Sequence, residues 1–294
     1  MQTPSSPSVV SRRSCLTGIV ATSLGSTLGA RTSTPRIYKA VKVSMIRTGE
    51  STLDKFKIAQ DAGFEGISLF APDRFVLAEA LTAQDRTGVR IHNVNGTHHW
   101  KVRLSDRDPA VRARAVSNLR ACIQFAGDVG GDSVLLVNGK VTDDQHENHD
   151  HVRSRSIDGI RKVLPLASRL GVRVLCENVG NGFCPDAVKW AEYLDSLESP
   201  FVGGFFDLGN HHGFGGAPHW IRTLAHRIVK IDVKDRHLGR DKNCDLFEGD
   251  VDWPLVRTAL HDIGFTGWAT AEVSGGDRDR IHQVAERMDQ ALAL

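Results

Sequence analysis

Short apolar runs alternate with amphipathic stretches along this chain from about residue 38 onward. Runs of about five apolar residues predict strands, and apolar residues three or four positions apart predict helices. The predicted strands are 40–44, 66–70, 89–93, 133–138, 173–177, 203–207, 228–232 and 269–273. The predicted helices are 52–62, 74–87, 110–129, 152–170, 186–197, 220–225, 253–263 and 278–292. This strict alternation indicates the α/β class and predicts a (βα)8 TIM barrel, a single domain over residues 38–294.

Repeated turn sequences support a barrel built from one recurring unit. Residues 61–66 (DAGFEG) closely match residues 262–267 (DIGFTG), and residues 87–90 (TGVR) match residues 170–173 (LGVR). In each copy, a glycine that can adopt the left-handed conformation ends a predicted helix, and a strand follows. The alternative, an open doubly wound sheet, has less support because no GxGxxG motif follows the first predicted strand.

The first 37 residues differ in composition from the rest and predict a disordered leader and linker. Ser11-Arg12-Arg13 precedes a mildly apolar stretch, residues 15–30, that contains no acidic residue. This arrangement predicts a twin-arginine export signal and therefore a periplasmic or otherwise exported protein. The stretch is too short and too polar to span a membrane. The alternative is a disordered tail with a chance arginine pair, which would leave the protein in the cytoplasm.

Composition and charge exclude several classes of partner. Charged residues make up 24% of the 294 residues, and the formal net charge is +2. A chain this close to neutrality gives no electrostatic reason to expect nucleic acid or an anionic membrane surface as a partner. The five cysteines form no CxxC motif, which argues against a zinc knuckle. A small molecule is the expected partner, and a homo-oligomer is compatible with the sequence.

Four acidic residues each end an apolar, strand-like run in the second half of the chain. They are Glu177, Asp207, Asp232 and Glu272. In a barrel, the carboxyl ends of adjacent strands meet at one mouth, so these carboxylates are expected to converge there. Carboxylates that face one another in a dry pocket do not all ionise without a cation, and a divalent metal satisfies that requirement. Oxygen ligands favour Mg²⁺ or Mn²⁺, whereas an added imidazole would admit Zn²⁺, Co²⁺ or Fe²⁺.

The alternative for each single acid is an ion pair with a base near a strand end. Lys230, Lys234 and Arg173 are the candidates. Such pairing would account for one or two of the acids more readily than for all four of them, so the metal site is the preferred interpretation.

The same residues carry a resemblance to a known family. An E-N after the fifth strand, D-x-x-N after the sixth, K-D at the seventh and A-E at the eighth resemble the sugar phosphate isomerase/epimerase family with the xylose isomerase-like barrel. The resemblance extends over roughly residues 40–290. It implies one divalent metal held by Glu177, Asp207, position 232 and Glu272. It also implies that Glu177 and Glu272 are the acid/base pair that removes and returns a proton beside a carbonyl.

Position 232 departs from the family pattern because it carries Asp where His is usual. An aspartate makes the ligand set more anionic and favours Mn²⁺ or Mg²⁺ over Zn²⁺ or Co²⁺. An alternative is that Asp232 points at Lys234 and binds no metal, in which case His211 or His212 would supply an imidazole. Other polar residues near the mouth are candidates for substrate binding. These are His99 and Trp100 after the third strand, Asn178 beside Glu177, and His211.

The predicted function is that of a metal-dependent isomerase or epimerase of a sugar or keto-sugar derivative. The metal would polarise a carbonyl, so that a carboxylate could move a proton from the neighbouring carbon. One alternative is a lyase or hydrolase on the same metal centre, with His99 or His211 as the acid. Another is an endonuclease-like repair enzyme, which the near-neutral charge argues against. The remaining alternative is a non-catalytic, secreted carbohydrate-binding barrel.

Overall fold

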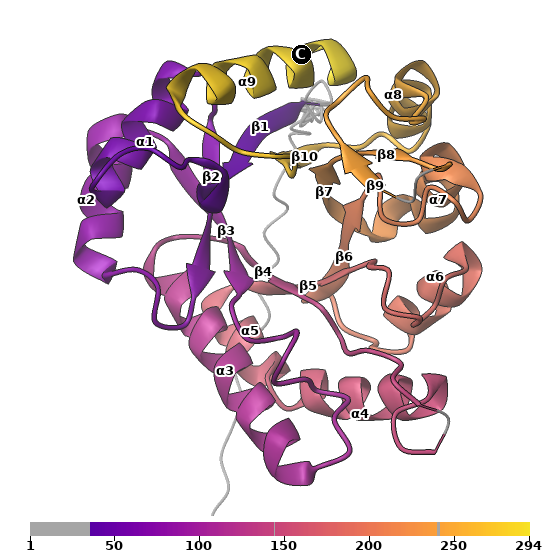
Figure 1. The fold of residues 1–294 in the computed structure, drawn as a ribbon. Coiled ribbons are helices and arrows are strands. Elements are labelled where there is room, and N and C mark those ends of the chain that lie inside the picture. The colour runs from indigo at the N-terminus through magenta and orange to yellow at the C-terminus, as the bar shows by residue number, and fades with distance from the viewer. Residues whose placement is uncertain (1–35, 144, 240–241) are drawn as a thin grey trace, which may run out of the picture. The chain divides into compact units, whose positions relative to one another are not determined.

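The computed structural model describes residues 36–294, apart from 144, 240 and 241, and its central feature is a closed barrel. Eight parallel strands form the barrel in the order β1-β10-β7-β6-β5-β4-β3-β2 (Figure 1). The strands are β1 (Ile37–Lys42), β2 (Gly66–Ala71), β3 (Arg90–Gly96), β4 (Ser133–Leu136), β5 (Arg173–Glu177), β6 (Val202–Asp207), β7 (Ile228–Val233) and β10 (Gly267–Ala271). The predicted TIM barrel is therefore confirmed. The predicted export leader lies outside the described residues.

Helices surround the barrel as an outer layer (Figure 1). In the described part of the chain they are α1 (Thr52–Asp61), α2 (Leu77–Thr87), α3 (Pro109–Asp128), α4 (His149–Arg161), α5 (Leu164–Leu170), α6 (Ala187–Asp195), α7 (Gly216–Leu224), α8 (Trp253–Asp262) and α9 (Arg278–Leu292). Short 3-10 turns cover Val43–Met45 and Ala225–Arg227. No helix among the described residues combines the length and the apolar character needed to cross a membrane.

The repeated turns are the part of the sequence that sets this alternation. Gly63, Gly88, Gly171 and Gly264 all have a positive φ, between 63° and 80°. Glycine adopts this left-handed conformation without a steric penalty, so each of the four ends its helix and redirects the chain toward the next strand. The two pairs of sequence repeats therefore occupy equivalent positions around the barrel.

Several predicted boundaries are wrong, among them the following three. The single helix predicted over 152–170 is two helices, α4 and α5, because Pro165 sits in the first turn of α5 and cannot continue a preceding helix. Helix α7 begins at Gly216, well before the predicted start at Trp220, because the glycine-rich sequence before it does not signal a helix. Strand β1 ends at Lys42, not at residue 44, and a 3-10 turn follows.

The loop after β7 contains a small antiparallel hairpin, β8 (Asp235–His237) and β9 (Lys242–Cys244), which the sequence did not predict. Asp235, which is fully buried, anchors this loop. Its carboxylate accepts hydrogen bonds from the backbone N–H groups of Phe247 and Val251 and from the indole of Trp253. This loop thus has a fixed connection to the carboxyl end of β7.

Inside the barrel, apolar side chains form a floor beneath the mouth. Leu135, Leu175 and Phe205 come from three consecutive strands and pack together, with Val229 against them. Their exposed fractions are 2% or less, so the floor separates the mouth from the amino-terminal half of the barrel. Polar groups above this floor lie in a pocket that is closed from below.

Candidate metal centre and active site

The four acidic residues meet at the mouth of the barrel, as the sequence predicted. Glu177 ends β5, Asp207 ends β6, Asp232 lies in β7 and Glu272 follows β10. Each offers one carboxylate oxygen, and these four oxygens lie within 4.8 Å of one another. Opposite ligands of an octahedral Mg²⁺ are about 4 Å apart, because each lies about 2 Å from the ion. The spacing therefore suits one small divalent ion.

Two lysine ammonium groups lie among these carboxylates. Lys42, from the end of β1, approaches Asp232 Oδ2 at 2.9 Å and Glu272 Oε2 at 2.7 Å. Lys234, just after β7, approaches Asp207 Oδ2 at 2.8 Å and Glu272 Oε2 at 3.3 Å. Both lysines are buried, with exposed fractions of 8% and 5%. Four carboxylates and two ammonium groups leave a formal charge of −2, which one divalent cation would balance.

Several carboxylate oxygens lack hydrogen bonds although they are buried. Asp232 Oδ1 has no hydrogen-bond partner among the described residues, and Asp207 Oδ2 and Glu272 Oε2 accept no hydrogen bond despite their nearby lysines. By contrast, Asp207 Oδ1 accepts two, from the backbone N–H groups of Gly209 and Asn210. Buried polar atoms are normally paired, so Asp232 Oδ1, which has neither a hydrogen bond nor an ion pair among the described residues, marks the place of a further ligand. The residues present thus fit a divalent metal.

The environment separates the two glutamates in acidity. Burial, reinforced by Glu272, raises the pKa of Glu177 to about 8. Burial would also raise the pKa of Glu272, but Lys42 and Lys234 together hold it well below its usual range. Burial raises the pKa of Asp232 and of Asp207. Two carboxyl groups whose pKa values are pushed apart are suited to act as an acid and a base.

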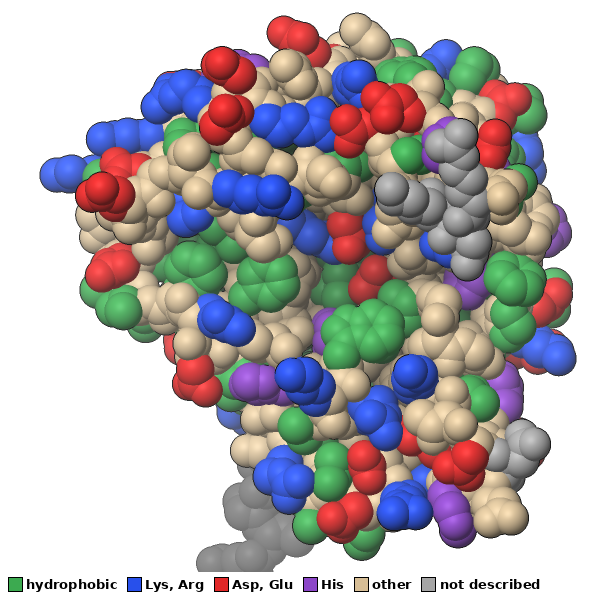
Figure 2. Space-filling model, in the orientation of Figure 1, with side chains coloured by type: hydrophobic (Ala, Val, Ile, Leu, Met, Phe, Trp, Pro, Cys, Tyr) green, Lys and Arg blue, Asp and Glu red, His purple; other side chains and the backbone are tan. Residues whose placement is uncertain are grey.

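Two of the four carboxylates, those of Glu177 and Glu272, border a cavity of about 340 Å³ at the mouth. Lys42, Phe70 and Trp100 also line it. Figure 2 shows acidic side chains deep in a hollow whose rim carries apolar and basic side chains. Cavities of this size bind small ligands, with polar groups fixing the orientation. A monosaccharide-sized molecule would contact the carboxylates directly.

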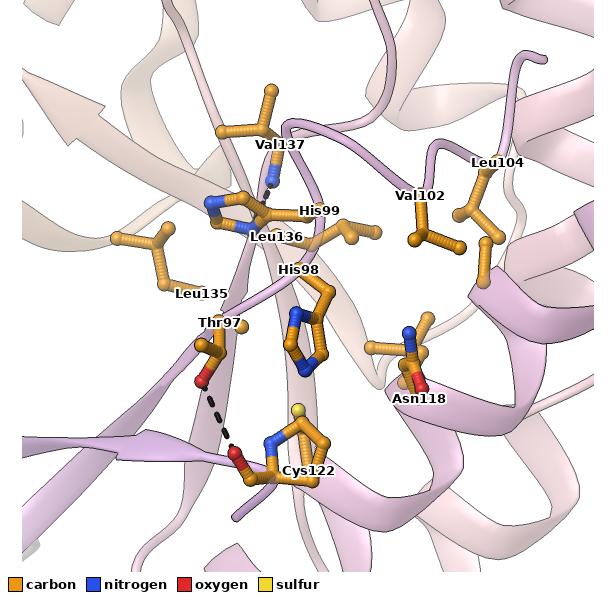
Figure 3. A pocket seen from close by; sticks show the side chains of 14 residues that line it. Thr97, His98, His99, Val102, Leu104, Asn118, Cys122, Leu135, Leu136 and Val137 are labelled. Atoms are coloured by element: carbon orange, nitrogen blue, oxygen red, sulfur yellow. Dashed lines mark hydrogen bonds between the residues drawn. The ribbon is translucent and has the colours of Figure 1, made fainter. Parts of the chain in front are cut away.

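His99 and Trp100 both line this cavity. The backbone N–H of Val137 donates a hydrogen bond to His99 Nδ1 at 3.2 Å, as Figure 3 shows. This bond fixes the neutral tautomer with its proton on Nε2, which makes His99 a donor. Burial, with Lys42 and His98, lowers the pKa of His99 to about 3. The loop that carries His99 packs on β4, and the cavity between them is only about 20 Å³, room for about one water. The imidazole ring of His99 is therefore held in place.

Asn178 and His211 take positions behind the carboxylates and do not line the cavity. The Asn178 side chain donates to the Asp207 carbonyl at 3.1 Å and accepts from the Asp207 N–H at 2.8 Å. It also contacts His211 Nδ1, and the His211 ring stacks on Trp220 at 4.7 Å. Burial lowers the pKa of His211 to about 4. Both residues therefore orient strand β6, and His211 is not in the four-carboxylate group.

Lys42 is the member of this charged cluster that the sequence pattern did not predict. Asp232 was considered as a partner of Lys234, but its partner is Lys42. Of the other proposed bases, Lys230 pairs with Asp132, away from the four acids. A signal was present, because Lys42 is the charged residue within the first predicted strand, 40–44, and β1 ends at this residue in the structure. A buried ammonium costs as much as a buried carboxylate, so the same reasoning applies to both signs of charge.

The closed barrel with a polar centre at the carboxyl ends of its strands defines the class of TIM-barrel proteins with a site at the mouth. Within that class, the chain belongs to the family of xylose isomerase-like TIM barrels, whose family model matches residues 56–293. The L-ribulose-5-phosphate 3-epimerase UlaE of Salmonella paratyphi A is 27% identical over 234 residues. These residues are 74% of this chain and 81% of UlaE.

Solved structures of sugar epimerases share the fold. L-ribulose 3-epimerase has a TM-score of 0.75 at 17% identity, covering 88% of this chain and 95% of its own. The 3-keto-D-glucoside 4-epimerase YcjR from E. coli has a TM-score of 0.74 at 14% identity, and the match covers 88% of this chain and 100% of YcjR. The IolI protein, solved with a bound zinc atom, has a TM-score of 0.74 at 14% identity, covering 87% and 98%. At these identities the likeness establishes the fold.

Proposed function

We propose that this protein is a divalent-metal-dependent epimerase or isomerase of a sugar or keto-sugar derivative. The observation that carries the proposal is the pair of glutamates, Glu177 and Glu272, which come from the two end strands, β5 and β10, of the four that supply the carboxylate cluster, and which line one cavity. The sugar epimerases among its relatives point to the same chemistry. A lyase or hydrolase on the same centre is the alternative to test, with His99 as its acid, because His99 lines the cavity and His211 does not.

Glu177, Asp207, Asp232 and Glu272 would hold the metal, which when bound would polarise a substrate carbonyl. Glu272, kept ionised by Lys42 and Lys234, is the base that takes a proton from the carbon beside the carbonyl. Glu177, at the other end of the carboxylate cluster, is the residue that returns a proton from the other side of the substrate. His99 donates from Nε2 to a substrate hydroxyl or carbonyl oxygen, and Trp100 covers a face of the sugar.

The ligand set favours Mn²⁺ or Mg²⁺, because all four candidate ligands are carboxylates. Zn²⁺, the ion in the IolI structure, and Co²⁺ are the other metal ions to test in this site. A small sugar is the proposed partner.

Exchange of substrate protons with solvent tests the reaction directly. In D₂O with Mn²⁺, the protein is expected to introduce deuterium at the carbon beside the carbonyl of a ketose, as NMR would detect. Glu177→Gln and Glu272→Gln should each slow this exchange by at least about 100-fold, because each removes one proton carrier. Glu65→Gln is the matched control, since Glu65 pairs with Arg36 at the opposite end of the barrel. Turnover of a sugar without deuterium incorporation would exclude this mechanism.

We also propose that the protein is exported through the twin-arginine signal at residues 11–13. Cell fractionation of the full chain and of an Arg12→Lys/Arg13→Lys variant tests this. Retention of only the variant in the cytoplasm is expected, whereas equal distribution of both would refute export by this route.

A further inference from the structure

A second cavity, of about 550 Å³, adjoins the one that contains the carboxylates. The two cavities share four lining residues, Ser44, Phe70, His99 and Trp100. The two cavities therefore meet at these residues, and a ligand that contacts Glu177 and Glu272 in the first cavity lies beside the second. The second cavity lies over the carboxyl ends of β2 and β3, and the carboxylates come from β5 to β10.

Aromatic rings form the walls of this outer cavity. Phe70 lies at the end of β2, Phe75 lies in the loop before α2, and Trp100 follows β3. Trp100 is 47% exposed, an unusual amount for a large aromatic side chain beside a polar site. Exposed aromatic surface that lines a hollow is typical of a binding surface for a flat or ring-shaped group.

The basic residues of the cavity do not form an anion site. Lys55 Nζ already donates a hydrogen bond to the Ile46 carbonyl at 2.5 Å, which directs its ammonium toward the backbone. Arg74 lies exposed at the rim of the cavity. A guanidinium at the rim can donate hydrogen bonds to hydroxyl groups, but phosphate sites usually combine several convergent donors. The aromatic walls therefore decide what the cavity accepts.

From these walls and their continuity with the carboxylates, we infer that the outer cavity is a subsite for a second ring. The substrate class is then a glycoside, a keto sugar in the inner cavity that carries a sugar or aryl ring in the outer one. This inference rests on the proposed function, since the inner cavity must hold the keto sugar. It deepens that function, because a free monosaccharide in the inner cavity would leave Phe75, an aromatic residue that lines only the outer cavity, uncovered.

A matched pair of ligands separates the two cavities. Methyl and phenyl 3-keto-β-D-glucopyranoside carry the same keto sugar and differ only in the group on the anomeric oxygen. Titration calorimetry of the full chain with Mn²⁺ should give a dissociation constant about tenfold lower for the phenyl glycoside, because one ring contacts aromatic walls. The 3-keto derivative of cellobiose, whose second ring is a sugar, distinguishes a sugar subsite from an aryl subsite by which of the two binds more tightly.

Phe75→Ala should remove the tenfold preference and leave the affinity for the methyl glycoside within about twofold, since Phe75 lines only the outer cavity. Leu81→Ala is the matched control, because Leu81 is an exposed apolar residue of α2 that lines neither cavity. Saturation-transfer NMR on the unaltered protein gives a readout that needs no variant. The phenyl protons should receive saturation as strongly as the sugar protons do.

The outcomes distinguish the subsite from the reaction. Equal affinities for the methyl and phenyl glycosides, with no saturation of the phenyl protons, would overturn the subsite and leave the proposed function standing. Binding of neither glycoside and of no free ketose would overturn both.

Discussion

Both ends of the barrel bury lysine side chains, but the charges around them balance only toward the amino-terminal end. Toward the amino-terminal end, Lys230 donates to the His92 carbonyl at 2.5 Å, contacts His92 Nδ1 at 3.2 Å and pairs with Asp132. At the carboxyl-terminal mouth, Lys42 and Lys234 lie among four carboxylates. The first arrangement has one ammonium and one carboxylate, whereas the second has twice as many acids as bases.

The difference separates a structural ion pair from a binding site. Among the described residues, the polar atoms of the Lys230 group all have partners, whereas Asp207, Asp232 and Glu272 each keep a buried oxygen without a hydrogen bond. Burying an unpaired charged oxygen is costly, and Asp232 Oδ1 has neither a hydrogen bond nor an ion pair among the described residues, so this point of the fold is adapted to a ligand. The lysines at the mouth reduce the cost without removing the need for a cation.

The largest effect on the free energy of unfolding is expected for Lys42→Met. This change leaves Asp232, which has no exposed surface, without its ammonium partner. In metal-free protein, the free energy of unfolding should fall by about 3 kcal/mol, because an unpaired carboxylate remains buried. Urea unfolding in the presence of a chelator measures this change. Added Mn²⁺ should stabilise the variant more than the unaltered protein, because the cluster then carries a formal charge of −3.

The double variant Lys42→Met/Asp232→Asn serves as the control for this prediction. Because it removes both charges of the pair, it should recover more than half of the lost stability in the absence of metal. If Lys42→Met alone were as stable as the unaltered protein, the ion pair would have no role in the site.

A smaller effect is expected on how the free energy of unfolding depends on pH, through Lys230 toward the amino-terminal end of the barrel. Burial lowers the pKa of Lys230 to about 8, although Asp132 acts against the shift. The unfolded chain therefore binds this proton more tightly than the folded protein, so the contribution of Lys230 to stability rises between about pH 8 and pH 10.5. The rise should be on the order of 2 kcal/mol and should be absent in Lys230→Met. Unfolding in urea at pH 7 and pH 10 would reveal it, and parallel curves for both proteins would contradict it.

The smallest effect on the free energy of unfolding is expected for Lys230→Met at pH 7. Asp132 is 64% exposed at its side chain, so water can solvate its carboxylate once the lysine is gone. The free energy of unfolding should change by no more than about 1 kcal/mol, and kcat for the epimerisation should stay within about twofold. A large loss of activity without a loss of stability would mean that the two ends are coupled.

Much of the fold could be predicted from the sequence because the signals were local. Gly63, Gly88, Gly171 and Gly264 end their helices at the positions where the repeats predicted turns. The errors lie where local signals are weak. Pro165 divides a stretch that is periodic on both sides, and the glycines before α7 conceal the start of that helix.

The candidate site was predicted in part. Acids at strand ends are visible in one sequence, and a parallel barrel brings such ends together. What pairs with each acid depends on register across the closed barrel, and Lys42 reaches Asp232 only because β1 and β7 both adjoin β10. Nor does a sequence show whether a polar side chain faces the cavity. Asn178 and His211 face the strands, and His99 and Trp100 face the cavity.

Elemental analysis of the purified protein, with metal titration after chelation, tests the central claim most directly. We expect one divalent ion per chain, and we expect Asp232→Ala and Glu177→Gln to lose it while both remain folded. Metal-free protein that carries out the proton exchange at its full rate would contradict the claim that the excess carboxylates at the mouth form a metal site.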